Sequence, residues 1–326
     1  MKRMRMAVIG VGHLGQHHAR VFAQLPRSEL RYVVDIVPER AHRIAQLYRT
    51  TALTDYRDIP FRDIDAVSVV TPTATHYEIV LHFLHAGIPV FVEKPMTSTA
   101  EEAQHLVDMA ARRHTLLAVG HIERFNPVCV RMPAMNMEQH PMFIEIHRVH
   151  PFVPRGIDVD IVTDLMIHDL DLLLMQLDGT IEVMDAVGIP VVTPHVDVAS
   201  VRLKKDLIRI NLVASRVSHF HTRRWMVFSA GRYLSLDFLH RQVTQMTVVD
   251  HQSGHMRIQD EKCTSRRELL ALELETFLDS LERGYVIPPL ATGAEGLRAL
   301  QFVERIVQSM AKVRHPDLSP WVMPLT

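Results

Sequence analysis

Three glycines near the start of the chain have the spacing of a nucleotide-binding turn. Gly10, Gly12 and Gly15 form a G-x-G-x-x-G pattern directly after an apolar run and before a helical segment. The first glycine permits a tight turn, the second lets the backbone approach a pyrophosphate, and the third allows close helix–sheet packing. The amides at the start of the following helix then face the phosphates. The pattern predicts a dinucleotide site, with His13 and Leu14 of the loop beside the cofactor.

An acidic residue stands where such a site needs one. Asp35 follows Gly15 by 20 positions, at the end of the second expected strand. A carboxylate there hydrogen-bonds the hydroxyls of the adenosine ribose and would repel a 2′-phosphate. Ile36 and Val37 offer no adjacent arginine to hold such a phosphate, and Arg40 is expected on a solvated helix face. The sequence therefore favours NAD(H) over NADP(H).

An aspartate and a histidine share one face of a later apolar helix. Asp164 and His168 are four positions apart in a helix expected over Asp164–Leu177, and this spacing brings side chains together. With Asp171 they could in principle ligate a cation. However, neither an H-E-x-x-H pattern nor a paired Cys/His spacing accompanies them. We therefore expect no metal ion at this helix.

The elements that must position these residues divide the chain in two. Through residue 122 the chain alternates helical segments with strands that are nearly all apolar, which is typical of a parallel sheet covered on both faces. This alternation predicts a doubly wound Rossmann domain over 1–122. The expected strands are Arg5–Ile9, Leu30–Val34, Ala66–Val70, Val90–Val92 and Leu116–Val119, and the helices are His13–Leu25, Glu39–Tyr48, Thr75–His85 and Ala100–Arg113.

The second part, 123–326, follows a different pattern. Prolines punctuate a stretch expected to be irregular, the apolar helix comes next, and β-rich segments then follow one another from Ile181 to about Val249. Strands in series with short connections predict a mostly antiparallel sheet. They are expected over Val196–Leu203, Ile208–Arg216, Trp225–Phe228, Tyr233–Leu236 and Val243–Val249, with closing helices over Arg267–Glu282 and Gly293–Ala311. The fold class is therefore α/β, with a Rossmann domain and a second α/β domain carrying a large open sheet.

Composition excludes several classes of protein. The 326 residues carry 36 Lys+Arg against 37 Asp+Glu, so the basic excess of a general nucleic-acid binder is missing. The 21 histidines suggest metal or pH sensing, but they scatter over every segment without ligand spacing. Cys129 and Cys263 are too far apart for a CxxC site. The short N-terminal apolar run does not fit a signal peptide, and no stretch fits a membrane helix. We expect a cytoplasmic protein.

Further motifs resemble the glucose–fructose oxidoreductase/inositol dehydrogenase family over essentially the whole chain. They are the glycine pattern, Thr71-Pro72-Thr73 followed by His76, Glu93-Lys94-Pro95, and Asp164-x-x-x-His168. The resemblance implies a cis Lys94–Pro95 peptide, which X–Pro bonds permit at modest cost. It also implies that Thr71, Pro72, Thr73, His76, Glu93 and Lys94 bind the cofactor.

The same resemblance implies that Lys94, Asp164 and His168 surround the reacting carbon. Oxidising a secondary alcohol removes a hydride to the nicotinamide and a proton from the hydroxyl, and a nearby cation stabilises the negative charge that develops on oxygen. We expect His168 to accept the proton, Asp164 to orient it, and Lys94 to polarise the sugar oxygen. The sequence leaves open an exchange of roles between Lys94 and His168.

Two segments are candidates for substrate selection. Gly120–Pro127 is similar to the G-x-x-x-R-F-x-P segment of the family, where Arg124 and Asn126 contact substrate hydroxyls or carbonyls, or else form a structural hinge. His121 is a possible neighbour of the site. Arg223 lies in a run of cations near Arg216 and Arg224 that either binds a diphosphate, since arginine pairs bidentately with phosphate oxygens, or forms a solvated or subunit-facing side of the sheet.

Together these segments resemble the branch of the family that oxidises C3 of UDP-N-acetylglucosamine. That reaction gives a 3-keto nucleotide sugar for later amination on the way to an amide-linked lipid A, which implies an aminotransferase as pathway neighbour. Two alternatives stay open: a dehydrogenase or reductase of a free sugar or cyclic polyol, and a non-catalytic NAD-binding regulator. The family resemblance also implies a homodimer or homotetramer, formed through the second sheet.

Overall fold

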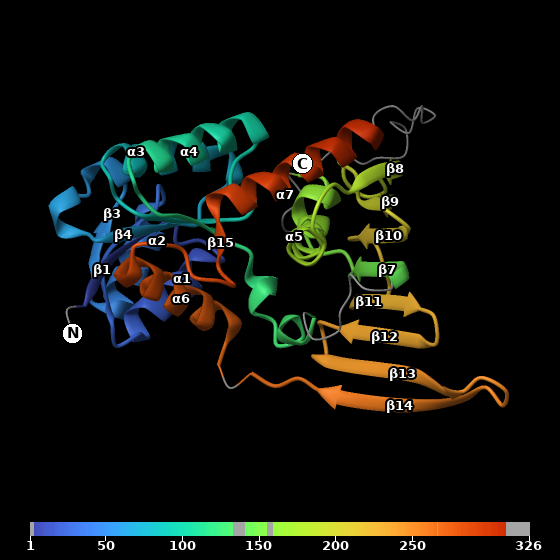
Figure 1. The fold of residues 1–326 in the computed structure, drawn as a ribbon. Helices are drawn as coiled ribbons and strands as arrows, with labels where there is room; N and C mark the ends of the chain where they lie inside the picture. Colours follow the sequence, from blue (N-terminus) through green and yellow to red (C-terminus); the bar gives the residue numbers. More distant parts are fainter. Residues whose placement is uncertain (1–2, 133–140, 155–158, 266, 311–326) are drawn as a thin grey trace. The chain divides into compact units, whose positions relative to one another are not determined.

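The computed structural model describes residues 3–132, 141–154, 159–265 and 267–310, drawn as a ribbon in Figure 1. These residues form two compact units, one within 1–125 and 267–300, the other within 126–266 and 301–326. Each unit has its own sheet. Among the described helices, none is both long enough and apolar enough to cross a membrane. The expected fold class is confirmed.

The first unit contains a seven-stranded sheet in the order β15-β6-β5-β4-β1-β2-β3. Its strands are β1 (Met4–Ile9), β2 (Ser28–Val34), β3 (Thr51–Leu53), β4 (Ala66–Val69), β5 (Val90–Glu93), β6 (Leu117–Gly120) and β15 (Ala291–Thr292). All neighbours are parallel except the short β15, which pairs antiparallel with β6. The carboxyl ends of the parallel strands therefore lie at one edge, where ligands bind in such sheets.

Helices cover both faces of this sheet because successive strand residues point to opposite sides. Ala7 and Ile9 pack in one apolar cluster with residues of α3 (His76–His85) and α4 (Ala100–Arg112). Met6 and Val8 pack in the other with residues of α1 (Gly15–Gln24), α2 (Pro38–Tyr48) and α6 (Leu269–Arg283). Figure 1 shows α3 and α4 on one side of the sheet and α1 and α6 on the other.

The position of α6 differs from the expected domain division. The chain leaves the first unit after Phe125, close to the expected boundary at 122, but 267–300 return to it. Leu274 and Phe277 of α6 are fully buried in the same cluster as Met6 and Val8. The apolar stripe of α6 completes the cover of the Rossmann sheet, and a linear division of the sequence cannot show which sheet a late helix covers.

The second unit contains an eight-stranded sheet in the order β14-β13-β12-β11-β7-β10-β9-β8. Its strands are β7 (Pro141–Val149), β8 (Glu182–Ile189), β9 (Val198–Lys205), β10 (Ile208–Ser215), β11 (Thr222–Ser229), β12 (Arg232–Asp237), β13 (Gln242–Asp250) and β14 (His255–Lys262). All pairs are antiparallel except β7 with β10.

Three strands of this sheet have no counterpart among the expected strands. One is β8, which lies within the β-rich stretch that begins at Ile181, and the others are β7 and β14. β7 lies inside the stretch expected to be irregular, yet it is a central strand, paired with both β10 and β11. Its only proline, Pro141, is the first residue, where a missing N–H is tolerated. β14 was not expected because its sequence is polar, and it forms the exposed edge of the sheet, paired with β13 alone.

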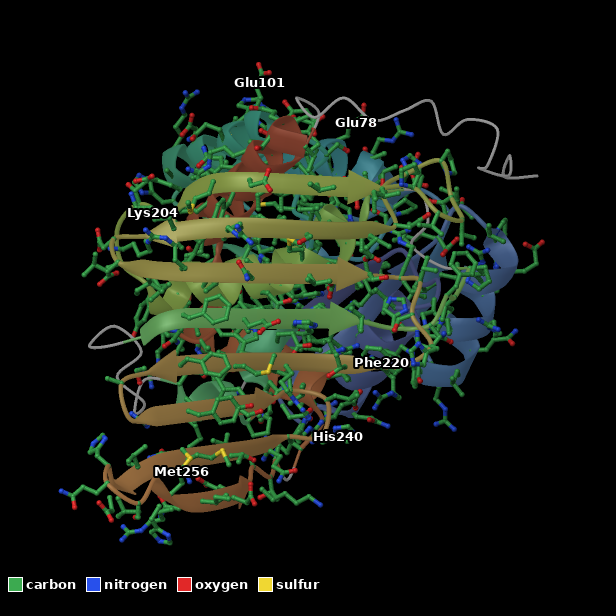
Figure 2. All side chains as sticks on the ribbon, turned by 90° about the vertical axis from the view of Figure 1, so that its right-hand side faces the viewer. Glu78, Glu101, Lys204, Phe220, His240 and Met256 are labelled. Carbon is green, nitrogen blue, oxygen red and sulfur yellow. The ribbon has the colours of Figure 1, made fainter. Side chains whose placement is uncertain are left out.

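The two faces of the second sheet have different compositions. The inner face carries apolar side chains such as Ile146, Leu212 and Trp225, all buried, and it bears α5 (Ile167–Gln176). The outer face carries side chains that alternate with these, among them Glu145, Asn211 and Met226. Figure 2 views this sheet with the outer face toward the reader, and no helix lies over the strands in that view.

Candidate active site

The glycine loop joins β1 to α1 and contains the close approaches that the spacing predicts. Gly10 has φ +83°, and a Cβ built on it would lie 2.7 Å from the Val70 carbonyl oxygen. A Cβ on Gly15 would lie 1.8 Å from the Gly10 carbonyl oxygen. A Cβ on Gly12 would meet no protein atom within 4 Å, so the loop backbone is open to an approaching phosphate. His13 and Leu14 are exposed beside it. The loop fits a pyrophosphate at a helix N-terminus.

Asp35 is held against this loop at the end of β2. Its Oδ2 accepts a hydrogen bond from the Val11 N–H at 3.1 Å, and its Oδ1 accepts one from the Val37 N–H at 3.0 Å. Arg40 lies on an exposed helix face, as expected, but its Nη1 is 3.9 Å from Asp35 Oδ1. The fixed carboxylate fits a ribose diol and favours NAD.

The loop after β4 is braced by a buried histidine. Thr71 and Pro72 precede a 3₁₀ turn over Thr73–Thr75, and His76 follows as the first residue of α3. The ring nitrogens of His76 lie 2.8 Å from the Thr71 carbonyl oxygen and 3.0 Å from the Pro95 carbonyl oxygen. Burial lowers the pKa of His76, although the carbonyls oppose this. The contacts favour support of the loop over direct contact with the cofactor.

Lys94 follows β5, and the Lys94–Pro95 peptide is cis, as the family resemblance implies. The lysine is half-buried. Its backbone N–H donates to Glu93 Oε2 at 3.2 Å, and Glu93 Oε1 lies 3.2 Å from His18 Nε2. Burial acts to raise the pKa of Glu93, but the hydrogen bond and charge of His18 and the charge of Lys94 lower it overall. A carboxylate is therefore fixed beside Lys94.

Arg124 and Asn126 lie where the chain leaves the first unit, and both contact the protein itself. Arg124 is buried, and its Nη1 donates to Glu295 Oε1 at 3.0 Å. In the second unit, the Asn126 amide donates to the Phe238 carbonyl oxygen at 3.0 Å and accepts from the Val128 N–H at 3.2 Å. These contacts favour the hinge reading of the segment, and substrate contact by either residue stays a prediction.

Asp164 lies in a widened turn of the second unit. A single α-helix is expected from Asp164, but Val162–Met166 form a π-helical turn that leads into α5. Asp160 caps this turn: its Oδ1 accepts from the N–H groups of Val162 and Thr163, each at 2.9 Å. A π turn holds more residues than an α-helical turn, so the common face of Asp164 and His168 stays a prediction. Such turns occur often at functional sites.

A buried acid next to His168 fixes α5 to the inner face of the sheet. Asp169 accepts from Arg148 Nε of β7 at 2.6 Å and from Trp225 Nε1 of β11 at 2.8 Å. Asp169, Arg148 and Trp225 are each almost fully buried. This anchor is absent from the expectations drawn from the sequence, although an aspartate in an apolar helix is a usable signal, because a buried charge needs partners.

The segment before the π turn is held by a second buried pair. Arg216 Nη2 donates to the Val159 carbonyl oxygen at 2.7 Å, and its Nε lies 3.7 Å from Asp197 Oδ1. Asp197 Oδ2 also accepts from three successive N–H groups, those of Val191, Val192 and Thr193, at 2.7–2.8 Å. Arg216 belongs to the cation run of the sequence, but it supports the chain rather than a solvated face.

The other basic residues near Arg216 lie at the same end of the second sheet as Arg216. Arg223 lies directly opposite Arg148 on the inner face, and the rings of His150 and His221 are 6.1 Å apart. Burial lowers the pKa of His221, and nearby basic groups lower it further; they are Arg223, His150, Arg148 and His240. Figure 2 labels His240 and Phe220 at this end of the strands and Lys204 at the opposite end.

The predicted site residues thus form two groups. Lys94 and the cofactor residues belong to the first unit, and Asp164, His168 and Arg223 belong to the second. That Lys94, Asp164 and His168 surround one carbon stays a prediction. Within the described ranges, no three histidine, cysteine or acidic side chains are placed to hold a metal ion.

The site and the fold together define a class of protein. Residues 4–121 match the model of an oxidoreductase family with an NAD-binding Rossmann fold, named for glucose–fructose oxidoreductase, inositol dehydrogenase and MocA. The chain belongs to this family, whose members include NAD-dependent sugar dehydrogenases, and its cofactor is NAD.

Similarity to individual members extends over nearly the whole chain. It is 37% identical to the UDP-N-acetylglucosamine 3-dehydrogenase of Acidithiobacillus ferrooxidans, over 92% of this chain and 95% of the relative. The solved structure of that enzyme superposes with a TM-score of 0.84, covering 95% of this chain and 99% of the other. The inositol 2-dehydrogenase of Rhizobium meliloti is 25% identical over 97% of this chain and 99% of its own length.

Proposed function

We propose that this protein oxidises the C3 hydroxyl of UDP-N-acetylglucosamine with NAD, giving a 3-keto nucleotide sugar. The observation that supports a nucleotide-linked substrate most directly is the cluster that the Arg223 cation forms with the imidazoles of His150 and His221, at the end of the second sheet where Arg216 holds the segment leading to Asp164. A diphosphate is the substrate group that such a cluster suits. The similarity to a UDP-N-acetylglucosamine 3-dehydrogenase supports the same substrate.

The cluster and the catalytic helix are both fixed to the inner face. Asp169, the neighbour of His168, accepts a hydrogen bond from Trp225 at 2.8 Å. Arg223 precedes Trp225 by two residues on β11 and therefore points to the same face, about 7 Å further along the strand. The strand β11 therefore fixes the distance between Arg223, which would bind the diphosphate, and α5, whose His168 would take the hydroxyl proton.

Bound NAD supplies the hydride acceptor, and the residues of this chain handle the proton and the developing charge. His168 takes the C3 hydroxyl proton, a task that suits imidazole because it exchanges protons near neutral pH. Asp164, four residues earlier, orients the imidazole and stabilises its cation. Lys94 places a positive charge beside the oxygen as it becomes a carbonyl.

The exchanged assignment, with Lys94 as proton acceptor, uses the same three residues. The two assignments of the proton acceptor are distinguished by the His168→Gln variant, which removes the imidazole but keeps a polar side chain. If His168 is the acceptor, kcat falls between about 10² and 10⁴-fold. If Lys94 is the acceptor, His168→Gln also lowers kcat, because the group that polarises the oxygen acts on charge that develops in the transition state, but the variant keeps the native pH dependence of kcat/KM. Loss of that pH dependence in His168→Gln assigns the proton to His168.

The substrate test offers the purified protein NAD with UDP-N-acetylglucosamine, UDP-glucose, free N-acetylglucosamine and myo-inositol. Hydroxylamine is included to trap a ketone product, and NADH is followed by absorbance. We expect NADH with UDP-N-acetylglucosamine and little with the free sugar. NADH with inositol or a free sugar alone would contradict the proposal and favour a polyol dehydrogenase, for which the likeness to inositol 2-dehydrogenases is the support.

Removal of the Arg223 cation tests recognition of the diphosphate. Arg223→Gln should raise the KM for the nucleotide sugar about 10- to 100-fold, because a charge-assisted hydrogen bond is lost. Arg62→Gln is the control, since Arg62 is exposed in the first unit and belongs neither to the cluster nor to the proposed interface. An unchanged KM in the Arg223 variant would remove the diphosphate from the proposal.

The proposed reaction implies a place in a biosynthetic pathway and a location in the cell. A 3-keto sugar is a substrate for transamination, so an aminotransferase consumes the product, and the amino sugar enters an amide-linked lipid A. Nucleotide sugars and NAD are cytoplasmic metabolites, and we place the protein in the cytoplasm. Amine formation from UDP-N-acetylglucosamine in a coupled reaction with a glutamate-dependent aminotransferase would support this place in the pathway.

We also propose that the outer face of the second sheet joins two copies of the chain. An apolar row crosses five strands of that face: Phe143, Phe228, Tyr233, Met246 and Ile258. The rings of Phe228 and Tyr233 are 5.1 Å apart. Eight strands of about eight residues cover roughly 900 Å², near the 800 Å² per partner of a stable interface. A homodimer, or a tetramer built from it, would cover this row.

A further inference from the structure

A buried histidine of α1 reaches the turn that carries Lys94. His18 is 2% exposed, and its Nε2 lies 3.2 Å from Glu93 Oε1. Its Nδ1 lies 3.0 Å from Ser68 Oγ. The ring donates from Nε2 to Glu93, and the Ser68 hydroxyl donates to Nδ1 of a neutral ring or accepts from Nδ1 of a protonated one, so both forms satisfy both contacts. One side chain of the nucleotide-binding helix thus connects β4 and β5.

The space around Glu93 is shaped for a carboxylate. A Cβ built on Gly120 of β6 would lie 2.9 Å from Glu93 Oε1, so a larger residue there would displace the acid. His18 is also confined from the other side by Phe91, with ring centroids 5.7 Å apart. Three adjacent strands and α1 therefore leave the carboxylate one position, and a buried charge kept in one position needs dedicated partners.

The fixed carboxylate acts on the backbone of Lys94. Glu93 Oε2 accepts from the Lys94 N–H at 3.2 Å, and on the far side of the cis peptide the Pro95 carbonyl oxygen lies 3.0 Å from His76 Nδ1. The turn is held both before and after the lysine. The backbone on both sides of the Lys94 side chain is therefore in contact with a buried histidine, His18 through Glu93 and His76 directly.

We propose that His18 is a positioning residue for Lys94: it fixes the Glu93 carboxylate, which in turn fixes the Lys94 turn and keeps a negative charge beside the amine. The inference rests on the role of Lys94 in the proposed function. It goes beyond that function because it assigns catalytic consequence to a buried residue of the nucleotide-binding helix. A displacement of about 1 Å at a reacting group costs about 100-fold in rate.

The test compares two substitutions of similar size. His18→Gln keeps an N–H donor close to the position of Nε2, whereas His18→Met fills the same space without one. We expect His18→Met to lower kcat about 10- to 100-fold with the NADH dissociation constant changed less than about twofold, and His18→Gln to keep most of kcat. In the His18→Met background, Glu93→Gln should cost much less than it does alone, because the two residues act as a unit.

A second readout does not depend on the sugar. The rate at which an acylating reagent labels Lys94, measured by mass spectrometry, should change in His18→Met and return toward the native rate in His18→Gln. His85→Met and His85→Gln serve as controls, since His85 is exposed at the end of α3.

Two results would overturn the inference. One is kcat in His18→Met equal to or above that in His18→Gln, which assigns the residue a packing role. The other is equal labelling of Lys94 in both variants and the native protein. If the native protein leaves UDP-N-acetylglucosamine unoxidised, the proposed function fails, while the labelling comparison still decides the role of His18.

Discussion

At the scale of single residues, the proposed chemistry rests on a cation, an acid and an imidazole, and the first and the last adjoin residues that the protein holds in place. Lys94 is flanked by Glu93 and the cis peptide. His168 is followed by Asp169, whose carboxylate binds Arg148 and Trp225. Each reactive side chain therefore has a short, rigid connection to a sheet, which is the condition for effective proton and hydride transfer.

Removal of the Lys94 amine should separate binding from chemistry. Lys94→Ala is expected to lower kcat between about 10² and 10⁴-fold, because the cation acts on charge that develops only in the transition state. The NADH dissociation constant should stay nearly native, as measured by fluorescence titration. Preserved turnover in Lys94→Ala would remove the lysine from the mechanism.

Asp35 should decide between the two nicotinamide cofactors. The native protein is expected to bind NADH more tightly than NADPH, since a fixed carboxylate repels a 2′-phosphate. Asp35→Ser should weaken NADH binding about 10-fold through the loss of charge-assisted hydrogen bonds. It should also bring NADPH closer to NADH, because Arg40 Nη1 lies 3.9 Å from the carboxylate in the native protein. Tighter binding of NADPH than NADH by the native protein would refute the assignment.

The sequence predicts the cofactor-binding residues better than the residues that hold the site in place. The glycine loop and Asp35 could be found because their spacing is imposed by the cofactor. His18, Arg216 and Asp197 could not, since their partners Glu93, Val159 and the amides of 191–193 are distant in sequence or are backbone atoms. For Arg124 and Asn126, the residue types suit substrate hydroxyls, and contacts within the protein are visible only in the structure.

At the scale of elements, the π turn and the loop before it set the position of α5, the helix that carries His168. The periodicity of the sequence predicts the helix but not the π-helical turn at its start. An apolar run has the same residue pattern whether it forms an α-helical or a π-helical turn. In the Rossmann sheet, Ser28–Val34 and Val90–Glu93 agree closely with expectation. The sequence does not predict β7 because the prolines around it are typical of a loop, although the only proline within the strand is its first residue, Pro141.

Loss of the Asp197 charge should loosen this part of the second unit. Burial acts to raise the pKa of Asp197, but the amides of Thr193, Val191 and Val192 lower it overall. Asp197→Asn places an amide donor against donors, and we expect the free energy of unfolding at neutral pH to fall by about 2–4 kcal/mol. Activity should fall with it, since Arg216 loses its partner near Val159.

The pH dependence of this difference has a definite sign. The folded pKa of Asp197 is lower than its unfolded value, ordinarily about 3.9. Its contribution is therefore fully present above that value and is lost as the pH falls through the lower folded pKa. Denaturant titrations of the native protein and Asp197→Asn should differ most near pH 7 and converge below about pH 4. A difference that grows in acid would contradict the account.

At the scale of the whole molecule, the chain builds two units and returns from the second to the first. The sequence predicts both sheets, because strand composition and helix alternation are local properties. It does not predict that α6 covers the Rossmann sheet. The apolar stripe of an amphipathic helix shows that one face is buried but not which sheet that face packs against. Leu274 and Phe277 show that α6 packs on the Rossmann sheet, because they lie in the same apolar cluster as Met6 and Val8.

The outer sheet face should govern association. Phe228→Glu places a charge in the middle of the apolar row, between Phe143 and Tyr233. We expect it to halve the mass measured by light scattering, from dimer to monomer or from tetramer to dimer, because a buried charge without a partner is costly at an interface. Lys204→Glu at the margin of the same face is the control. A monomeric native protein would contradict the proposed assembly.

The central claim is that hydride leaves C3 of UDP-N-acetylglucosamine for NAD. Deuterium placed at C3 of the sugar tests it most directly, with mass spectrometry of the reduced cofactor and of the hydroxylamine-trapped product. The account predicts reduced cofactor that carries the deuterium and a product that has lost it. Deuterium retained in the sugar while NADH forms, or NADH formed only from sugars without a nucleotide, would contradict it.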